Sequence, residues 1–205
     1  MKGAIQMSNL ENYMKQQAIF CEQNDSISKN LYSEYGVKRG LRDEKGQGVL
    51  TGLTNISDIK AFEYHDGVKS PCDGELSYRG YNIKDLVTGG KGKRFIFEEG
   101  AYLLLFGELP TNTQLMEFQG KLSDCMELPT DFTRDVIMKA PTSDIMGSMT
   151  RSILTLGSYD KEKESLEIPN VLRQSMQLIA VFPMLAVYAY HAYCHYEKNE
   201  SMYIH

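Results

Sequence analysis

The sequence predicts a mainly α-helical protein with a small β region near its N-terminal end. After Phe95, apolar residues recur every three or four positions, which is the spacing of one helix face. Before it, residues 50–63 are rich in Thr, Ile and Val with glycine breaks, which is typical of short strands. We therefore expect 1–48 to form N-terminal helices and a basic segment, 49–83 the β region, and 84–205 the helical part of one domain.

Composition narrows the function classes. The 205 residues suffice for one large domain or two small ones, and the net charge of −5 gives no reason to expect nucleic-acid binding. Four cysteines lie far apart without a C-x-x-C pair, which favours reduced thiols: Cys21, Cys72, Cys125 and Cys194. No apolar run of signal-peptide length opens the chain. The longest apolar stretch, 178–190, falls short of the ~20 residues of a membrane span. We expect a cytoplasmic protein.

The N-terminal part alternates between helical and extended patterns. Residues 9–24 predict a first helix and 28–35 a short second one, and the basic, glycine-punctuated segment 36–48 follows them. Two Asp-Gly pairs between Tyr64 and Gly74 predict turns. The alternation at 76–81 predicts a strand that pairs with those before it.

The helices after Phe95 have recognisable ends. Gly107 stands where a left-handed cap is expected, and Pro110 prevents continuation. Thr111 and Gln114 have the spacing of a capping box before a helix that runs to about Met126. Pro129 and Thr130 open a short helix that Pro141 ends.

Two further helices close the chain. One, over 144–157, is capped by Thr142 or Ser143 and ends at Gly157. Its expected apolar stripe is Met146, Met149, Ile153 and Leu156, and its small residues that permit close helix approach are Gly147, Ser148 and Ser152. The other runs over about 170–196, begins after Pro169 and is about 40 Å long. It is apolar on all sides over 178–190, so we expect burial all round, with a bend at Pro183.

A histidine and cysteine cluster near the end of the long helix could converge on zinc. His191, Cys194 and His195 share one helix face, but a fourth ligand is missing and Ala192 stands where a zincin requires Glu. Histidines in the last turns also suit the negative end of a helix, and we favour this reading. No metal site is assigned.

Other charged groups have weaker patterns. The loop 89–94 lacks the first Gly and the hydroxyl of a Walker loop, so it reads as a solvated loop. A second basic cluster consists of Lys38, Arg39, Arg42 and Lys45. These side chains could bind a polyphosphate, although their spacing alone favours a run of solvent-exposed charges. Four acidic residues have no spacing that fixes mutual geometry: Asp58, Asp66, Asp73 and Glu75. We assign no catalytic residue from these patterns.

Two motifs together resemble a known family. Ser77-Tyr78-Arg79-Gly80-Tyr81-Asn82-Ile83, with Phe97-Glu98-Glu99 through Pro110, is similar to the N-terminal signature of the citrate synthases. The resemblance extends over about 39–205. Ile96 replaces the usual Ser or Thr cap, and the segment 56–76 is longer than in many relatives. The resemblance implies a partial citrate-synthase-like multi-helical large domain, incomplete at 205 residues because family members are roughly twice as long.

The resemblance also implies an activity. The family condenses acetyl-CoA with oxaloacetate to citrate and CoA, a step of the tricarboxylic acid cycle, using two histidines and an aspartate. The segments that carry them are absent here, so we expect an N-terminal fragment that is inactive alone, with its catalytic residues beyond His205. Arg39, in Lys38-Arg39-Gly40-Leu41, matches an arginine that helps hold coenzyme A. No cofactor is expected to be tightly bound, because coenzyme A enters as substrate.

The sequence is compatible with two alternative functions. A 2-methylcitrate synthase that uses propionyl-CoA would look the same in this half, and a non-catalytic helical module for dimerisation or regulation is the alternative from another class. The resemblance also implies a homodimer whose interface uses the helices over 144–157 and 170–196.

Overall fold

The computed structural model describes part of the chain, which divides into two compact units. The described residues are 13–14, 17–19, 23, 28, 30–36, 40–42, 46, 48–49, 53–89 and 95–202. The units are Met1–Thr54 and Asn55–His205. In the first unit, α2 (Asn30–Glu34) confirms the short second helix. Most of the expected helix over 9–24 lies outside the described residues.

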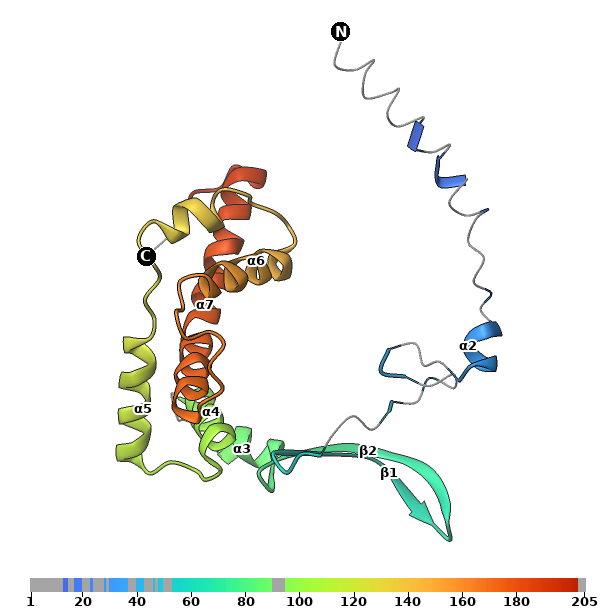
Figure 1. Cartoon of the computed structure of the whole chain (residues 1–205). Helices are drawn as coiled ribbons and strands as arrows, with labels where there is room; N and C mark the ends of the chain where they lie inside the picture. Colours follow the sequence, from blue (N-terminus) through green and yellow to red (C-terminus); the bar gives the residue numbers. More distant parts are fainter. Residues whose placement is uncertain are drawn as a thin grey trace. The chain divides into compact units, whose positions relative to one another are not determined.

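The second unit opens with a long β-hairpin (Figure 1). β1 (Ser57–His65) pairs with β2 (Val68–Tyr78), and β3 (Tyr81–Asn82) completes an antiparallel sheet in the order β1-β2-β3. Asp66 and Gly67 connect the first two strands with φ of 50° and 80°, the two positive values of a type I′ turn. The first Asp-Gly turn and the strand pairing at 76–81 are thus confirmed.

The second Asp-Gly pair was expected to be a turn, and this expectation was wrong. Asp73 and Gly74 lie within β2, where the register shifts: Lys60 pairs with Glu75, but Phe62 pairs with Pro71. One residue of β1 therefore faces three of β2, and the surplus is absorbed in a bulge. Strand pairing continues on both sides of the bulge, so the chain does not reverse there.

Helices make up the remainder of this unit (Figure 1). They are α3 (Ile83–Gly89), α4 (Ile96–Phe106), α5 (Asn112–Asp124), the π-helix η1 (Thr133–Ile137), α6 (Ile145–Gly157) and α7 (Ile168–Lys198). α7 contacts α5, α6 and η1, and α4 contacts α5. One core cluster contains Phe132, Ile137, Val181, Leu185, Ala189 and Ala192, and a second contains Phe118, Leu122 and Ala180. The prediction of a mainly α protein with a small β region is confirmed.

Several predicted helix ends are confirmed. Gly107 has φ of 88°, and its N–H donates to the Leu103 carbonyl at 2.8 Å, which ends α4. At the start of α5, the Thr111 hydroxyl accepts from the Gln114 N–H, while the Thr111 N–H donates to the Gln114 side chain. This reciprocal pair is the capping box. Pro169 occupies the first turn of α7.

The cap of α6 differs from the prediction. Asp144 is the N-cap residue itself, and its Oδ1 accepts from the Gly147 N–H at 2.9 Å. Thr142 lies outside the helix, where its hydroxyl accepts from the Asp144 N–H at 3.1 Å. A carboxylate at the N-cap also faces the positive end of the helix dipole, so Asp144 has a stronger acceptor to offer than either hydroxyl.

The expected burial of α6 and α7 was wrong in part. Met146 is 78% exposed, although it was placed on the apolar stripe of α6, whereas Ser148 and Ser152 are buried. On α7, Phe182 is 42% exposed and Tyr190 49% exposed. The neighbouring elements α5, α6 and η1 cover one side of α7, and an apolar stripe on its other side lies open.

The length and composition of α7 also meet the criteria for a membrane span, and only 17% of its most apolar window is buried within the described residues. The core helix of a soluble protein passes the same test. Val181, Leu185 and Ala189 of α7 lie in the first core cluster.

Candidate functional site

The predicted coenzyme A residue, Arg39, lies outside the described residues, as do Lys38, Lys45 and the loop residues 90–94. Arg42 is described, and its Nη1 donates to the Gly46 carbonyl at 2.7 Å. This bond holds Arg42 against its own loop. The assignment of Arg39 to coenzyme A stays a prediction.

The four acidic residues of the hairpin are all exposed and lie along its length. Asp66 forms the turn, Asp58 lies on β1, and Asp73 and Glu75 lie on β2 near the bulge. No hydrogen bond or ion pair joins any two of them among the described residues. They offer no paired carboxylates for acid–base chemistry.

The histidine and cysteine cluster is not assembled for metal binding. Cys194 is 1% exposed, and its hydrogen bond with Tyr190 raises the pKa of that phenol. His195 places Nδ1 2.9 Å from the Glu200 carbonyl, which follows the end of α7. Within the described ranges, no three His, Cys, Asp or Glu side chains are grouped around a common point.

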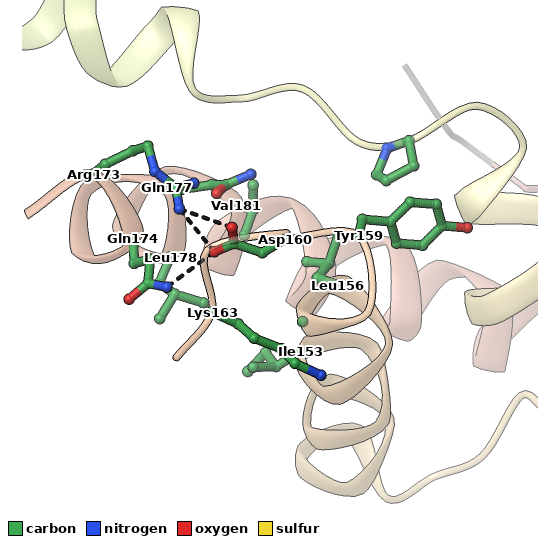
Figure 2. Close-up of a pocket in the computed structure, with 12 residues that line it drawn as sticks. Ile153, Leu156, Tyr159, Asp160, Lys163, Arg173, Gln174, Gln177, Leu178 and Val181 are labelled. Carbon is green, nitrogen blue, oxygen red and sulfur yellow. Dashed lines mark hydrogen bonds and ion pairs between the residues drawn. The ribbon is translucent and has the colours of Figure 1, made fainter. Parts of the chain in front are cut away.

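A pocket of about 310 Å³ lies between the end of α6, the connection that follows it and the first half of α7 (Figure 2). Its walls are partly apolar and partly polar. The lining residues include Ile153, Leu156, Asp160, Lys163, Arg173, Gln174, Gln177 and Val181. All of them belong to the second unit.

Asp160 is held by several hydrogen bonds at this pocket (Figure 2). Its carboxylate accepts from Arg173 at 2.9 Å and from the Gln174 amide at 2.9 Å, and it also accepts from the Glu162 N–H at 3.0 Å. The Gln174 hydrogen bond, followed by the bond from Arg173, lowers the pKa of Asp160 from 3.8 to about 2. The carboxylate is therefore ionised throughout the physiological range.

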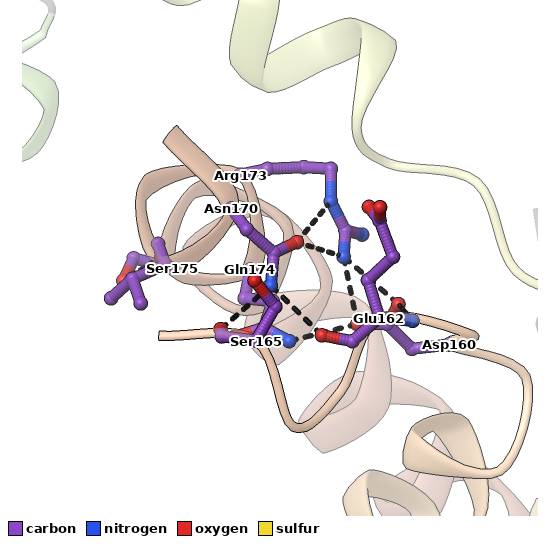
Figure 3. Close-up of polar contacts among 8 residues, drawn as sticks. Asp160, Glu162, Ser165, Asn170, Arg173, Gln174 and Ser175 are labelled. Carbon is purple, nitrogen blue, oxygen red and sulfur yellow. Dashed lines mark hydrogen bonds and ion pairs between the residues drawn. The ribbon is translucent and has the colours of Figure 1, made fainter. Parts of the chain in front are cut away.

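Asn170 extends this network into the first turn of α7 (Figure 3). Its amide donates to the carbonyls of Glu162 and Ser165, each at 2.9 Å. Its Oδ1 accepts from Arg173 at 2.6 Å. Asn170 is buried, and these bonds satisfy both ends of its amide, as a buried polar group requires.

The network anchors the connection between α6 and α7 and is poorly suited to catalysis. A carboxylate that accepts four hydrogen bonds and has a pKa near 2 accepts protons weakly at neutral pH. By contrast, Lys163 and Gln177 line the pocket without a hydrogen bond or ion pair among the described residues. The pocket can therefore hold a ligand, but it offers no acid–base pair for a reaction.

The comparison with known families decides the family of the chain. The model described as "Citrate synthase, C-terminal domain" matches residues 41–204. The chain belongs to the citrate synthase family. Among curated relatives, the citrate synthase of Saccharolobus solfataricus is 31% identical over 154 residues, which is 75% of this chain and 35% of that enzyme. The 2-methylcitrate synthase of Shewanella oneidensis is 34% identical over 116 residues, which is 56% of this chain and 28% of that enzyme.

Solved citrate synthases share the fold. The enzyme from Pyrobaculum aerophilum superposes with a TM-score of 0.57 at 24% identity, covering 77% of this chain and 39% of that one. The Thermoplasma acidophilum enzyme, solved with carboxymethyl coenzyme A and oxaloacetate, gives 0.59 at 19% identity, covering 76% and 36%. The predicted family and fold are thus confirmed. The chain spans about a third of the length of the curated relatives it matches.

Sequence reasoning missed the polar network around Asp160. Asp160 and Arg173 are separated by 13 positions, and no periodic pattern connects them. One signal was available, since Asn170 directly follows the Pro169 that opens α7. A polar residue in the first turn of a helix has nearby backbone groups to bond with.

Proposed function

We propose that the chain is part of an acyltransferase that condenses acetyl-CoA with oxaloacetate to citrate and CoA. The observation that carries this proposal is the family match over 41–204. The citrate synthase relative of Saccharolobus solfataricus supports it at 31% identity. The name of the matched model refers to a C-terminal domain, and placement of this chain in the N-terminal part of the large domain belongs to the proposal. A cytoplasmic location belongs to it as well.

In this family, a methyl proton of acetyl-CoA is removed, the resulting enol attacks the ketone of oxaloacetate, and the thioester is hydrolysed. That chemistry needs a base for the methyl group and a stabiliser for the enol. Among the described residues, no acid–base pair is arranged to supply these functions. We therefore assign the chemical steps to residues outside this chain, and coenzyme A recognition in part to Arg39.

A second candidate differs only in the acyl donor. The 2-methylcitrate synthase of Shewanella oneidensis is 34% identical over its aligned part, so propionyl-CoA is the alternative substrate. The third candidate, a non-catalytic module that dimerises with or regulates a complete enzyme, is favoured by the absence of an acid–base pair from the described pocket.

The assay that separates these proposals measures free CoA thiol from acetyl-CoA or propionyl-CoA with oxaloacetate. The purified 205 residues should give only the chemical background. The product of the complete reading frame should turn over, faster with acetyl-CoA than with propionyl-CoA. Turnover by the 205 residues alone would contradict the assignment of the catalytic groups to residues outside this chain, and no turnover by the complete product would favour the non-catalytic module.

We further propose that the chain forms a homodimer through α6 and α7. The open stripe on α7 includes Phe182 and Tyr190, and Met146 and Leu154 of α6 are exposed as well. Exposed apolar stripes on two long helices are typical of surfaces that partners cover. In a two-fold dimer the same stripe would meet its own copy.

A further inference from the structure

We propose that the pocket between α6 and α7 binds a short aliphatic carboxylate, whose chain contacts the apolar floor and whose carboxylate pairs with Lys163. This inference goes beyond the proposed reaction, because no step of the condensation is assigned to this pocket. It would make the pocket a binding site separate from the chemistry, of the kind that regulates an enzyme through small metabolites.

The size and floor of the pocket fit a small apolar chain. Its volume of about 310 Å³ is at the lower end of the range of ligand pockets, roughly 300–1,000 Å³. Ile153 and Leu156 of α6 form one side of the floor, and Val181 of α7, which is 1% exposed, forms the other. All three pack in the first core cluster, so the floor is a rigid surface already built for apolar contact.

The charges around the pocket favour an anion. Its ionisable lining groups are Asp160, Lys163, Arg173 and the phenol of Tyr159. Asp160 and Arg173 form an ion pair at 2.9 Å, so their charges offset each other. With that pair neutral overall, Lys163 gives the groups that line the pocket a net charge of about +1 at neutral pH. Asp160 cannot neutralise Lys163 as well, since its carboxylate already accepts from Arg173, Gln174 and the Glu162 backbone.

Polar groups at the pocket remain available to orient the ligand (Figure 2). Gln177 lines the pocket without a hydrogen bond among the described residues, so its amide is available to a polar group of a ligand. The network of Asp160, Asn170 and Arg173 fixes the connection that carries Lys163. An apolar floor with a few free polar groups is the general form of a small-molecule site.

The test is an NMR titration of the isotope-labelled 205-residue chain with sodium hexanoate in the absence of coenzyme A. We expect saturable shifts at Ile153, Leu156, Gln177 and Val181. Lys163→Met keeps most of the unbranched side chain and removes its charge, so it should weaken hexanoate binding roughly fivefold. Lys161→Met is the matched control, because Lys161 lies two positions away and does not line the pocket.

Hexan-1-ol provides the second arm, since it keeps the apolar chain without the charge and should bind less tightly than hexanoate to the unmodified chain. Equal affinity for the alcohol and the carboxylate would overturn the role of Lys163, as would equal weakening by the two lysine variants. Absence of saturable shifts at the floor residues, or saturable shifts confined to another surface, would overturn the site itself. None of these outcomes depends on whether the complete protein forms citrate.

Discussion

Arg79 donates from Nη2 to the carbonyl of Leu104 at 3.0 Å and thereby joins the turn between β2 and β3 to the end of α4. Arg79 and Gly80 form the two-residue turn between β2 and β3, with φ of 49° and 86°. The Leu104 carbonyl belongs to the last turn of α4 and has no partner within its helix. The Tyr-Arg-Gly-Tyr motif therefore serves both as a type I′ turn and as a helix cap supplied from outside the helix.

Arg79→Ala should destabilise this unit by about 1–2 kcal/mol, because it removes a half-buried hydrogen bond from a charged donor. The measurement is urea unfolding followed by circular dichroism. Lys84→Ala, an exposed lysine on α3, is the control and should change stability by less than about 0.5 kcal/mol. Equal stability of the two variants would show that the bond to Leu104 is unimportant.

Asp160 should make stability depend on pH in the acid range. Its pKa is lowered from 3.8 to about 2, so its contribution to stability is complete above about pH 4 and is lost as pH falls towards 2. Asp160→Asn should flatten this part of the profile of urea midpoints against pH. Asp73→Asn, which alters an exposed residue of β2, should keep the wild-type profile, and a wild-type profile in Asp160→Asn would contradict the prediction.

Phe182→Glu should dissociate the proposed dimer, because a charge placed on the open stripe of α7 would be buried against its own copy. Light scattering over a dilution series measures the mass. Met116→Glu is the control, since Met116 is an exposed apolar residue of α5, a helix outside the proposed interface. A monomer mass for the unmodified chain at every concentration would rule the dimer out.

In the proposed acyltransferase, Arg39→Ala should raise the apparent KM for acetyl-CoA several-fold, because the phosphate partner that we propose for coenzyme A would be lost. The KM for oxaloacetate should stay unchanged and serves as the internal control. Steady-state kinetics with each substrate varied in turn measures both. An unchanged KM for acetyl-CoA would contradict the proposed role of Arg39 in binding coenzyme A.

Local rules predicted the end of α4, the start of α5 and the first hairpin turn well, because each depends on a few neighbouring residues. Gly107 and the Thr111–Gln114 capping box needed only the geometry of one helical turn. The Asp66-Gly67 turn needed only two residues that accept positive φ. The turn predicted at Asp73-Gly74 was wrong for a non-local reason. The partner strand β1 continues past this pair, so β2 forms a bulge there instead of a turn.

The sequence by itself determined the helical class, several helix ends and the motifs that indicated the family. Only the tertiary structure decided which side of α7 is buried. When a helix is apolar on all sides, its sequence pattern does not indicate which face packs against neighbouring helices. The same holds for the Asp160–Arg173 pair and for the cap that Arg79 supplies to α4. Each joins residues that are distant in sequence, and such contacts follow from packing rather than from any local pattern.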